Sequence, residues 1–262
     1  MIIRSTLKKR LLAGEIVLGT FVWADGVNSV EILGNSGFDF VILDTEHAPG
    51  TPESIINQLR AAEGRGMDAI VRLPNTARTT VLRALDIGVS GALAPQVNDF
   101  ETARAFIDAT LYPPLGCRGF ASVRATGYGL IDSIPEYLAE ANSDLLRIVQ
   151  CETENAVLNL NEIAKIEEID MIFVGPYDLS LSLGVPGEFD HPKMTDAIDA
   201  ILAVCKEYDK MTGILVSSPE EVKNRIEQGF KFLAYSVDIL ILAAAAKNIT
   251  SVARNIIREL KP

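Results

Sequence analysis

The sequence has few of the residues that build disulfide frameworks or thiolate metal sites. Three cysteines occur among 262 residues, at Cys117, Cys151 and Cys205, and no two of them have the Cys-x-x-Cys spacing. An odd count without that spacing argues against a disulfide framework and against a thiolate zinc site. Cys205 lies within an apolar helical pattern, so we expect it to be a buried side chain.

Long apolar runs are also missing. No run approaches the roughly 20 residues that a membrane-spanning helix needs. The longest, residues 239–246, is expected to be a buried helical stretch. Residues 1–15 contain basic side chains but no long apolar segment of the kind found in a secretion signal. We therefore expect a cytoplasmic protein without a membrane partner.

Positive charge is scarce. The chain has 24 Lys and Arg against 35 Asp and Glu, a formal net charge of −11. This balance disfavours nucleic acid and anionic membranes as partners, because binding to phosphates requires clustered basic side chains. An anionic small substrate is still compatible with the charge if the protein holds a cation locally.

Short apolar runs alternate with amphipathic helical patterns along the whole chain. Runs that are apolar on both faces and alternate with helices are typical of a parallel sheet covered by helices. Eight such units in 262 residues predict one (β/α)8 TIM barrel domain over residues 1–262, with helix N-caps that include Thr51 and Ser218. The expected strands are 16–23, 38–46, 68–74, 91–97, 145–152, 170–176, 212–218 and 231–237. A doubly wound open sheet is the alternative, but no Gly-x-Gly-x-x-Gly follows the first run to support a dinucleotide fold.

Polar side chains gather at the predicted carboxyl ends of the strands, where barrel enzymes carry their active sites. Those that end the second, third, fifth and sixth strands are Asp44, Glu46, His47, Arg72, Gln150, Glu152 and Asp178. Glu152 and Asp178, on neighbouring strands, are expected to converge on one hard cation, Mg²⁺ or Mn²⁺, because such ions prefer oxygen ligands. A single carboxylate after a strand is more often a helix cap or an ion-pair partner, so the prediction depends on the coincidence of several strands.

No lysine ends a predicted strand. Lys210 and Lys231 precede the seventh and eighth strands and therefore lie at the opposite end of the barrel. Activation of a carbonyl is expected from a metal ion and Arg72 rather than from a Schiff-base lysine. The turn after the seventh strand, SSPEE, has two carboxylates and lacks glycine, which disfavours a phosphosugar substrate.

One connection, residues 112–129, is too long for a simple turn and contains Arg118 and Arg124. Long irregular connections in compact domains are usually functional or mobile. The sequence is equally compatible with a surface excursion and with a role at the site.

Five motifs give the chain a resemblance to a known family. They are GFDFVILDTEHAP, LRALDIGVSGALAPQV, YPPLGCRG, QCETENAVLNLNEI and FVGPYDLSLSLG, and the likeness runs from about residue 19 to residue 238. Together they resemble the HpcH/HpaI family of class II, metal-dependent pyruvate aldolases, which have a phosphoenolpyruvate/pyruvate-type barrel. The resemblance implies cleavage of a 4-hydroxy-2-oxo acid or a 2-keto-3-deoxy sugar acid to pyruvate and an aldehyde through a metal-stabilised pyruvate enolate.

The resemblance also implies catalytic roles. His47 is the implied base and Arg72 the group that stabilises the developing enolate. Asp86 is implied as the carboxylate that raises the basicity of the histidine, whereas the residues alone describe it as an ordinary polar residue at a helix end. Asp44 and Glu46, which flank His47, are the other candidates to orient it, and the choice among the three stays open.

For the metal and the substrate, the resemblance implies a further set. Glu152 and Asp178 are the implied metal ligands, with Mg²⁺ or Mn²⁺ expected and Co²⁺ or Zn²⁺ as alternatives. Substrate contacts are implied for Gln150, Tyr177 and Asp178. Tyr177 departs from the family, which often has a small residue at that position, so the pocket volume is expected to differ.

Another departure concerns the first strand. Many members of the family carry a tryptophan where this chain has Phe21. Trp23 faces the same way by strand periodicity, and it either replaces that tryptophan or packs in the core. His191 is expected to have a structural role in a loop before a helix.

Other functions share this machinery. Oxaloacetate decarboxylation and cleavage of a CoA thioester are the enzymatic alternatives, although the chain has no surplus basic surface for CoA phosphates. A barrel that only binds 2-oxo acids is the non-enzymatic alternative. The resemblance further implies a homo-oligomer, typically a hexamer, in which a terminal helix is exchanged between subunits. The apolar stretch from Ile239 onward fits that helix, and it fits an intramolecular eighth helix equally well.

Overall fold

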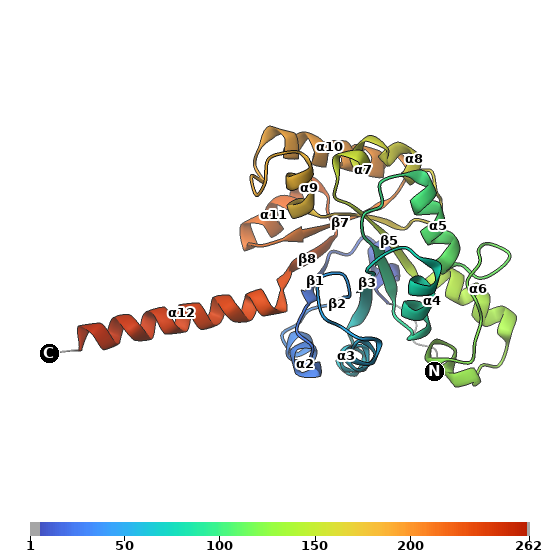
Figure 1. Cartoon of the computed structure of the whole chain (residues 1–262), viewed down its shortest axis with the longest axis horizontal. Coiled ribbons are helices and arrows are strands. Elements are labelled where there is room, and N and C mark those ends of the chain that lie inside the picture. Colours follow the sequence, from blue (N-terminus) through green and yellow to red (C-terminus); the bar gives the residue numbers. More distant parts are fainter. Residues whose placement is uncertain (1–5, 261–262) are drawn as a thin grey trace.

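The structure, a computed structural model, describes residues 6–260 as a closed barrel of parallel strands in sequential order (Figure 1). The strands are β1 Val17–Val22, β2 Phe40–Asp44, β3 Asp68–Arg72, β4 Gly91–Ala94, β5 Leu146–Cys151, β6 Met171–Val174, β7 Met211–Val216 and β8 Phe232–Val237. The barrel closes through pairing of β1 with β8, with Val17 opposite Phe232. The predicted (β/α)8 fold is therefore confirmed, and every expected strand is present.

Helices cover the outside of this barrel and follow the expected alternation. They are α1 Leu7–Leu12, α2 Val27–Asn35, α3 Pro52–Gly64, α4 Arg78–Asp86, α5 Phe100–Thr110, the 3₁₀ helix η1 Arg124–Gly129, α6 Ile134–Asp144, α7 Glu154–Leu158, α8 Leu160–Ala164, α9 Pro176–Ser182, α10 Pro192–Glu207, α11 Pro219–Gln228 and α12 Asp238–Glu259. Thr51 and Ser218 cap α3 and α11 as predicted, each accepting a hydrogen bond from a main-chain N–H in the first turn. His191 caps α10 in the same way, which confirms its structural role.

Phenylalanine rings fill the inside of the barrel. Phe40 and Phe232 stack with ring centroids 4.1 Å apart, and Phe173 meets Phe232 edge to face at 6.0 Å. Gly19 makes room for these rings, because a Cβ built at that position would lie 2.3 Å from the Phe40 ring. The barrel interior is thus a packed core, and open space is left only toward the strand ends.

The long connection of residues 112–129 lies outside the barrel against α3 and α4. Arg124 pairs with Glu63 of α3 and donates a hydrogen bond to the Ile87 carbonyl oxygen at 2.8 Å. Arg118 packs over the Tyr112 ring, 4.5 Å from its centroid, and lies 3.6 Å from Asp86. These contacts describe a surface excursion, one of the two alternatives that the sequence left open.

Helix α12 extends away from the barrel (Figure 1). Its apolar side chains are exposed, Leu242 to 70%. The expectation that residues 239–246 form a buried stretch is therefore wrong for the described chain, and α12 is not an eighth helix packed on its own barrel. Helical periodicity shows that an apolar face exists but does not show which surface covers it.

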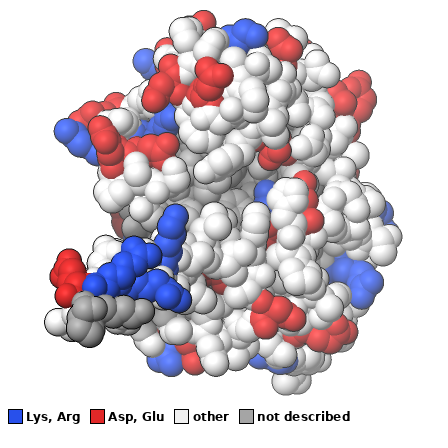
Figure 2. Space-filling view, turned by 60° about the vertical axis from the view of Figure 1, so that its left-hand side comes forward, with Lys and Arg blue, Asp and Glu red and all other residues white. Residues whose placement is uncertain are grey.

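The two faces of α12 differ in character. Leu242, Ile249 and Ile256 recur at seven-residue spacing on one face, and Lys247 and Arg254 lie on another. Figure 2, in which the α12 side of the molecule is turned toward the viewer, shows Lys and Arg side chains gathered at the lower left. The helix has the length and composition of a possible membrane span, but a lysine near its middle would cost about 2.5–3.5 kcal/mol there. The amphipathic pattern fits a protein surface better.

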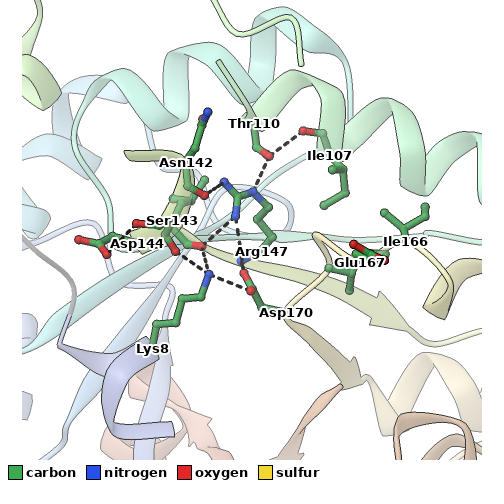
Figure 3. A network of polar contacts seen from close by, with 12 residues as sticks. Lys8, Ile107, Thr110, Asn142, Ser143, Asp144, Arg147, Ile166, Glu167 and Asp170 are labelled. Carbon is green, nitrogen blue, oxygen red and sulfur yellow. Dashed lines mark hydrogen bonds and ion pairs between the residues drawn. The ribbon is translucent and has the colours of Figure 1, made fainter. Parts of the chain in front are cut away.

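At the end of the barrel opposite the carboxyl ends of the strands, a buried ionic network joins α1, α6, β5 and the residue that precedes β6 (Figure 3). Arg147 is 2% exposed, and burial lowers its pKa. It donates hydrogen bonds to the Thr110 hydroxyl at 2.9 Å and to the Asn142 carbonyl oxygen at 2.7 Å. Asp170 lies 3.9 Å from the same guanidinium and 2.8 Å from Lys8 Nζ. The network fastens the N-terminal helix to the base of the barrel.

Replacing Arg147 by methionine should lower the free energy of unfolding by about 3 kcal/mol, because removing one partner from a buried ion pair leaves the other groups unsatisfied. Urea unfolding followed by circular dichroism measures the change. Lys165→Met is the matched control, since Lys165 forms only an exposed pair with Glu162, and its effect should be small. Equal losses in the two variants would contradict the role given to the network.

Candidate active site

A cavity of about 380 Å³ opens at the carboxyl ends of the strands. Of the residues predicted from the sequence, it is lined by His47, Arg72, Gln150, Tyr177 and Asp178. These side chains come from β2, β3, β5 and the start of α9, so segments far apart in the chain meet at one end of the barrel. Glu152 lies just behind the lining, where its carboxylate contacts the amide of Gln150.

The central contact of this site joins Asp44 to Arg72. The Arg72 guanidinium donates to both carboxylate oxygens of Asp44, with a distance of 2.9 Å from Nε to Oδ1. Asp44 is 1% exposed and Arg72 is 5% exposed, so neither charge has water to solvate it. Glu46 Oε2 lies 3.3 Å from Arg72 Nη1, and Phe21 packs beneath the guanidinium with its centroid 4.8 Å away. Arg72 is held in one orientation by contacts on three sides.

Asp44 also shapes the turn that carries the histidine. Its Oδ1 accepts hydrogen bonds from the main-chain N–H groups of Glu46, at 2.9 Å, and of His47, at 3.5 Å. The carboxylate therefore positions the backbone of His47 rather than its ring. The imidazole faces the Trp23 ring edge to face, with centroids 6.0 Å apart.

The three carboxylates proposed to orient His47 lie in different places. Burial raises the pKa of Glu46, against the effect of Arg72. Asp86 is at the end of α4, pairs with Arg118, and does not belong to the lining of the cavity. Within one chain, the structure brings His47, Arg72, Asp44 and Glu46 together but not Asp86, whose role stays a prediction.

Glu152 is the most perturbed carboxylate at the site. Burial raises its pKa to about 7, and the negative charges of Asp178 and Glu46 act in the same direction. A hydrogen bond from the Gln96 main-chain N–H, at 2.8 Å, acts against this rise. Gln96 adopts a left-handed conformation, with φ of 53°, at this point. The position of the Glu152 carboxylate also requires glycine at position 175, because a Cβ there would lie 2.9 Å from this carboxylate.

This arrangement fits a hard divalent cation. Asp178 is close enough to Glu152 for its negative charge to raise the pKa of Glu152, in the same direction as burial. The buried Oε1 of Gln150 has no hydrogen-bond partner in the described chain. The described residues contain no group of three or more His, Cys, Asp or Glu side chains that would hold a metal ion alone. Two carboxylates leave coordination positions for water and substrate oxygens, as is usual for Mg²⁺.

Sequence reasoning missed three contributors to the site. The Gln96 main-chain amide and Gly175 act through backbone geometry, which side-chain patterns do not report. Asp238 was overlooked although it directly follows the eighth strand; its carboxylate accepts a hydrogen bond from the Trp23 main-chain N–H at 2.9 Å. A carboxylate after a strand was the available signal, and it was obscured by the serines that end β7 and β8.

Comparisons with known proteins identify the family of the chain and support its fold. Residues 18–245 match the family model described as HpcH/HpaI aldolase/citrate lyase. The chain is 34% identical to a 4-hydroxy-2-oxo-heptane-1,7-dioate aldolase of Escherichia coli, over 93% of this chain and 92% of that protein. It is also 34% identical to a 2-keto-3-deoxy-L-rhamnonate aldolase of the same species, over 93% and 91%. A solved HpcH/HpaI aldolase from Desulfitobacterium hafniense superimposes with a TM-score of 0.89 at 30% identity, over 97% of each chain.

Proposed function

Because the chain belongs to the HpcH/HpaI aldolase/citrate lyase family, we propose that it is a divalent-metal-dependent aldolase. It cleaves a 4-hydroxy-2-oxo acid or a 2-keto-3-deoxy sugar acid to pyruvate and an aldehyde. The observation that carries this proposal is the meeting of His47, the Asp44–Arg72 pair and the Glu152–Asp178 carboxylates at one end of the barrel. The two aldolases named above act on substrates of these two classes.

Each residue has a task that follows from its position. Glu152 and Asp178 would hold a divalent cation such as Mg²⁺ or Mn²⁺, which would supply Lewis-acid polarisation of the 2-oxo carbonyl. Arg72, held by Asp44, presents fixed positive charge where the enolate oxygen develops, in a site with little competing water. His47 removes the proton of the 4-hydroxyl group, directly or through a water molecule. Gln150 and Tyr177 border the same space and contact the substrate.

Oxaloacetate decarboxylation is the companion activity that the same site supports. That reaction also forms a pyruvate enolate, so it uses Arg72 and the carboxylate pair, but it has no hydroxyl proton for His47 to remove. Cleavage of a CoA thioester is less compatible with the cavity, because the one lysine or arginine among its described lining residues, Arg72, is already bound to Asp44.

We also infer that the protein is a cytoplasmic homo-oligomer in which α12 packs on a neighbouring subunit. An apolar helix face that its own barrel does not cover is typical of an interface. The exchanged helix implied by the family resemblance, and the hexamer that goes with it, are consistent with the projection of α12 (Figure 1).

The metal requirement gives the first test of the proposal. Pyruvate release from a racemic 4-hydroxy-2-oxo acid should stop when EDTA removes divalent ions, and Mg²⁺ or Mn²⁺ should restore it. Glu152→Gln should weaken Mn²⁺ binding, measured by calorimetry, by more than about 100-fold, since loss of an outer-shell partner alone costs about 10–100-fold. Glu154→Gln, at an exposed glutamate two positions along the chain, is the control and should bind Mn²⁺ normally. Activity that resists EDTA and is trapped by borohydride would instead indicate a Schiff base.

The role of His47 predicts a difference between two reactions of one enzyme. His47→Ala should lower kcat for aldol cleavage by about 10²–10⁴-fold, the usual contribution of a general base. Oxaloacetate decarboxylation should fall much less, because no hydroxyl proton is removed. Steady-state assays of pyruvate formation measure both activities. Equal losses in the two reactions would show that His47 binds substrate or supports the structure instead.

The exposed face of α12 predicts the oligomeric behaviour. Leu242→Glu combined with Ile249→Glu should yield a smaller species in size-exclusion chromatography with light scattering, because charges would be buried in the interface. Arg254→Glu, on the polar face of the same helix, is the control and should leave the mass unchanged. A wild-type protein that is monomeric at micromolar concentration would contradict the assembly.

A further inference from the structure

The cavity continues past His47 into a region that the proposed chemistry does not use. We call it the apolar compartment and define it by Trp23, Leu215, Val237 and Leu240, all of which line the cavity. Trp23 and Leu215 pack against the same interior core cluster that contains Val237. The Trp23 ring faces the His47 imidazole, so the compartment adjoins the proposed base, and Leu240 extends it to the start of α12.

Two buried polar side chains hold the main chain at Trp23, the residue that forms one wall of the compartment. Asp238, at the start of α12, accepts hydrogen bonds from the main-chain N–H groups of Trp23 at 2.9 Å and Ala24 at 3.2 Å. The Gln58 side chain donates to the Ala24 carbonyl oxygen at 2.8 Å. Both Asp238 and Gln58 are buried. The main chain that carries the indole is thus set by the fold before any ligand enters, while the buried indole N–H has no hydrogen-bond partner in the described chain.

The charges around the compartment are unfavourable for an anionic group. Arg72 is the one lysine or arginine among the described residues that line the cavity, and its guanidinium is already bound by Asp44 and Glu46; the other basic group in the lining is His47, the proposed base. Ser217, at the rim, donates its hydroxyl hydrogen bond to Glu221 at 2.8 Å. The hydroxyl hydrogen of Ser217 is therefore already used, and a carboxylate at the far end of a substrate would enter an apolar space, where a buried unpaired charge is strongly disfavoured.

We propose that the apolar compartment binds the aldehyde-derived half of the substrate, that this aldehyde is uncharged and largely apolar, and that Trp23 sets the preference. The inference rests on the proposed aldolase function and names its substrate class. Each methylene group that leaves water for the compartment strengthens binding about fourfold. An acid-terminated aldehyde gains nothing comparable, since its charge has no free basic partner there.

The test compares two four-carbon aldehydes in the condensation direction, with pyruvate and Mn²⁺. Butanal is uncharged, and succinic semialdehyde carries a terminal carboxylate on a chain of the same length. We expect kcat/KM for butanal to exceed that for succinic semialdehyde by at least about tenfold. Enolate formation is measured separately in the absence of aldehyde. NMR follows the exchange of the pyruvate methyl hydrogens for deuterium in D₂O.

Trp23→Ala should reduce the ratio of the two kcat/KM values by at least about tenfold, and Trp23→Phe should retain most of it. Phe100→Ala, which removes an exposed aromatic ring outside the cavity, is the matched control and should keep the wild-type ratio. Leu240→Arg provides a second route that does not depend on the stability of the tryptophan variants. A basic side chain in the compartment should raise the relative use of succinic semialdehyde by at least about tenfold.

The outcomes separate this inference from the proposed function. Hydrogen exchange in the wild type together with a preference for succinic semialdehyde overturns the apolar aldehyde and leaves the aldolase intact. A ratio that neither Trp23→Ala nor Leu240→Arg changes overturns the placement of the aldehyde in the compartment. Absence of exchange in the metal-loaded wild type overturns the aldolase itself, and the present inference fails with it.

Discussion

The pairing of Asp44 with Arg72 is the interaction on which the site depends. Both charges are buried at the ends of neighbouring strands, where Asp44 and Arg72 are directly opposite each other in the register of β2 and β3. A buried guanidinium without its carboxylate would be strongly destabilising, so the pair fixes both side chains in the folded state. Because the same carboxylate holds the turn that carries His47, Asp44 places the proposed base and the proposed enolate-stabilising group relative to each other.

The second constraint is an excess of negative charge. Asp44 and Glu46 bind Arg72, whereas Glu152 and Asp178 form no ion pair with a described residue. Burial, with the negative charges of Asp178 and Glu46 acting in the same direction, raises the pKa of Glu152 to about 7. The fold sustains this arrangement with a hydrogen bond from the Gln96 main-chain N–H and with the missing Cβ of Gly175. A buried carboxylate beside a partly buried one favours a divalent cation, which would give a chain of net charge −11 local positive charge for an anionic substrate.

The fold and the residues at the strand ends were predictable because they follow from local order along the chain. Apolar runs that alternate with helices predict parallel strands whose carboxyl ends lie at one end of the barrel. This order alone predicts that a common site contains His47, Arg72, Gln150 and Asp178. Contacts that join distant segments were not predictable. The turn at Gln96 depends on backbone conformation, and the partner of α12 depends on a surface that the sequence of one helix does not describe.

Asp238, which the sequence reasoning also missed, connects helix α12 to the wall of the cavity at Trp23. It starts α12 and at the same time holds the main chain of Trp23, so the base of the projecting helix and the wall of the cavity form one rigid unit. Leu240, two residues further along, lines the cavity, while Leu242 already lies on the exposed apolar face. Any surface that fixes the direction of α12 therefore also fixes one side of the space beside His47. The conformation of that space and the packing of the helix depend on the same few residues, which is why neither follows from the barrel alone.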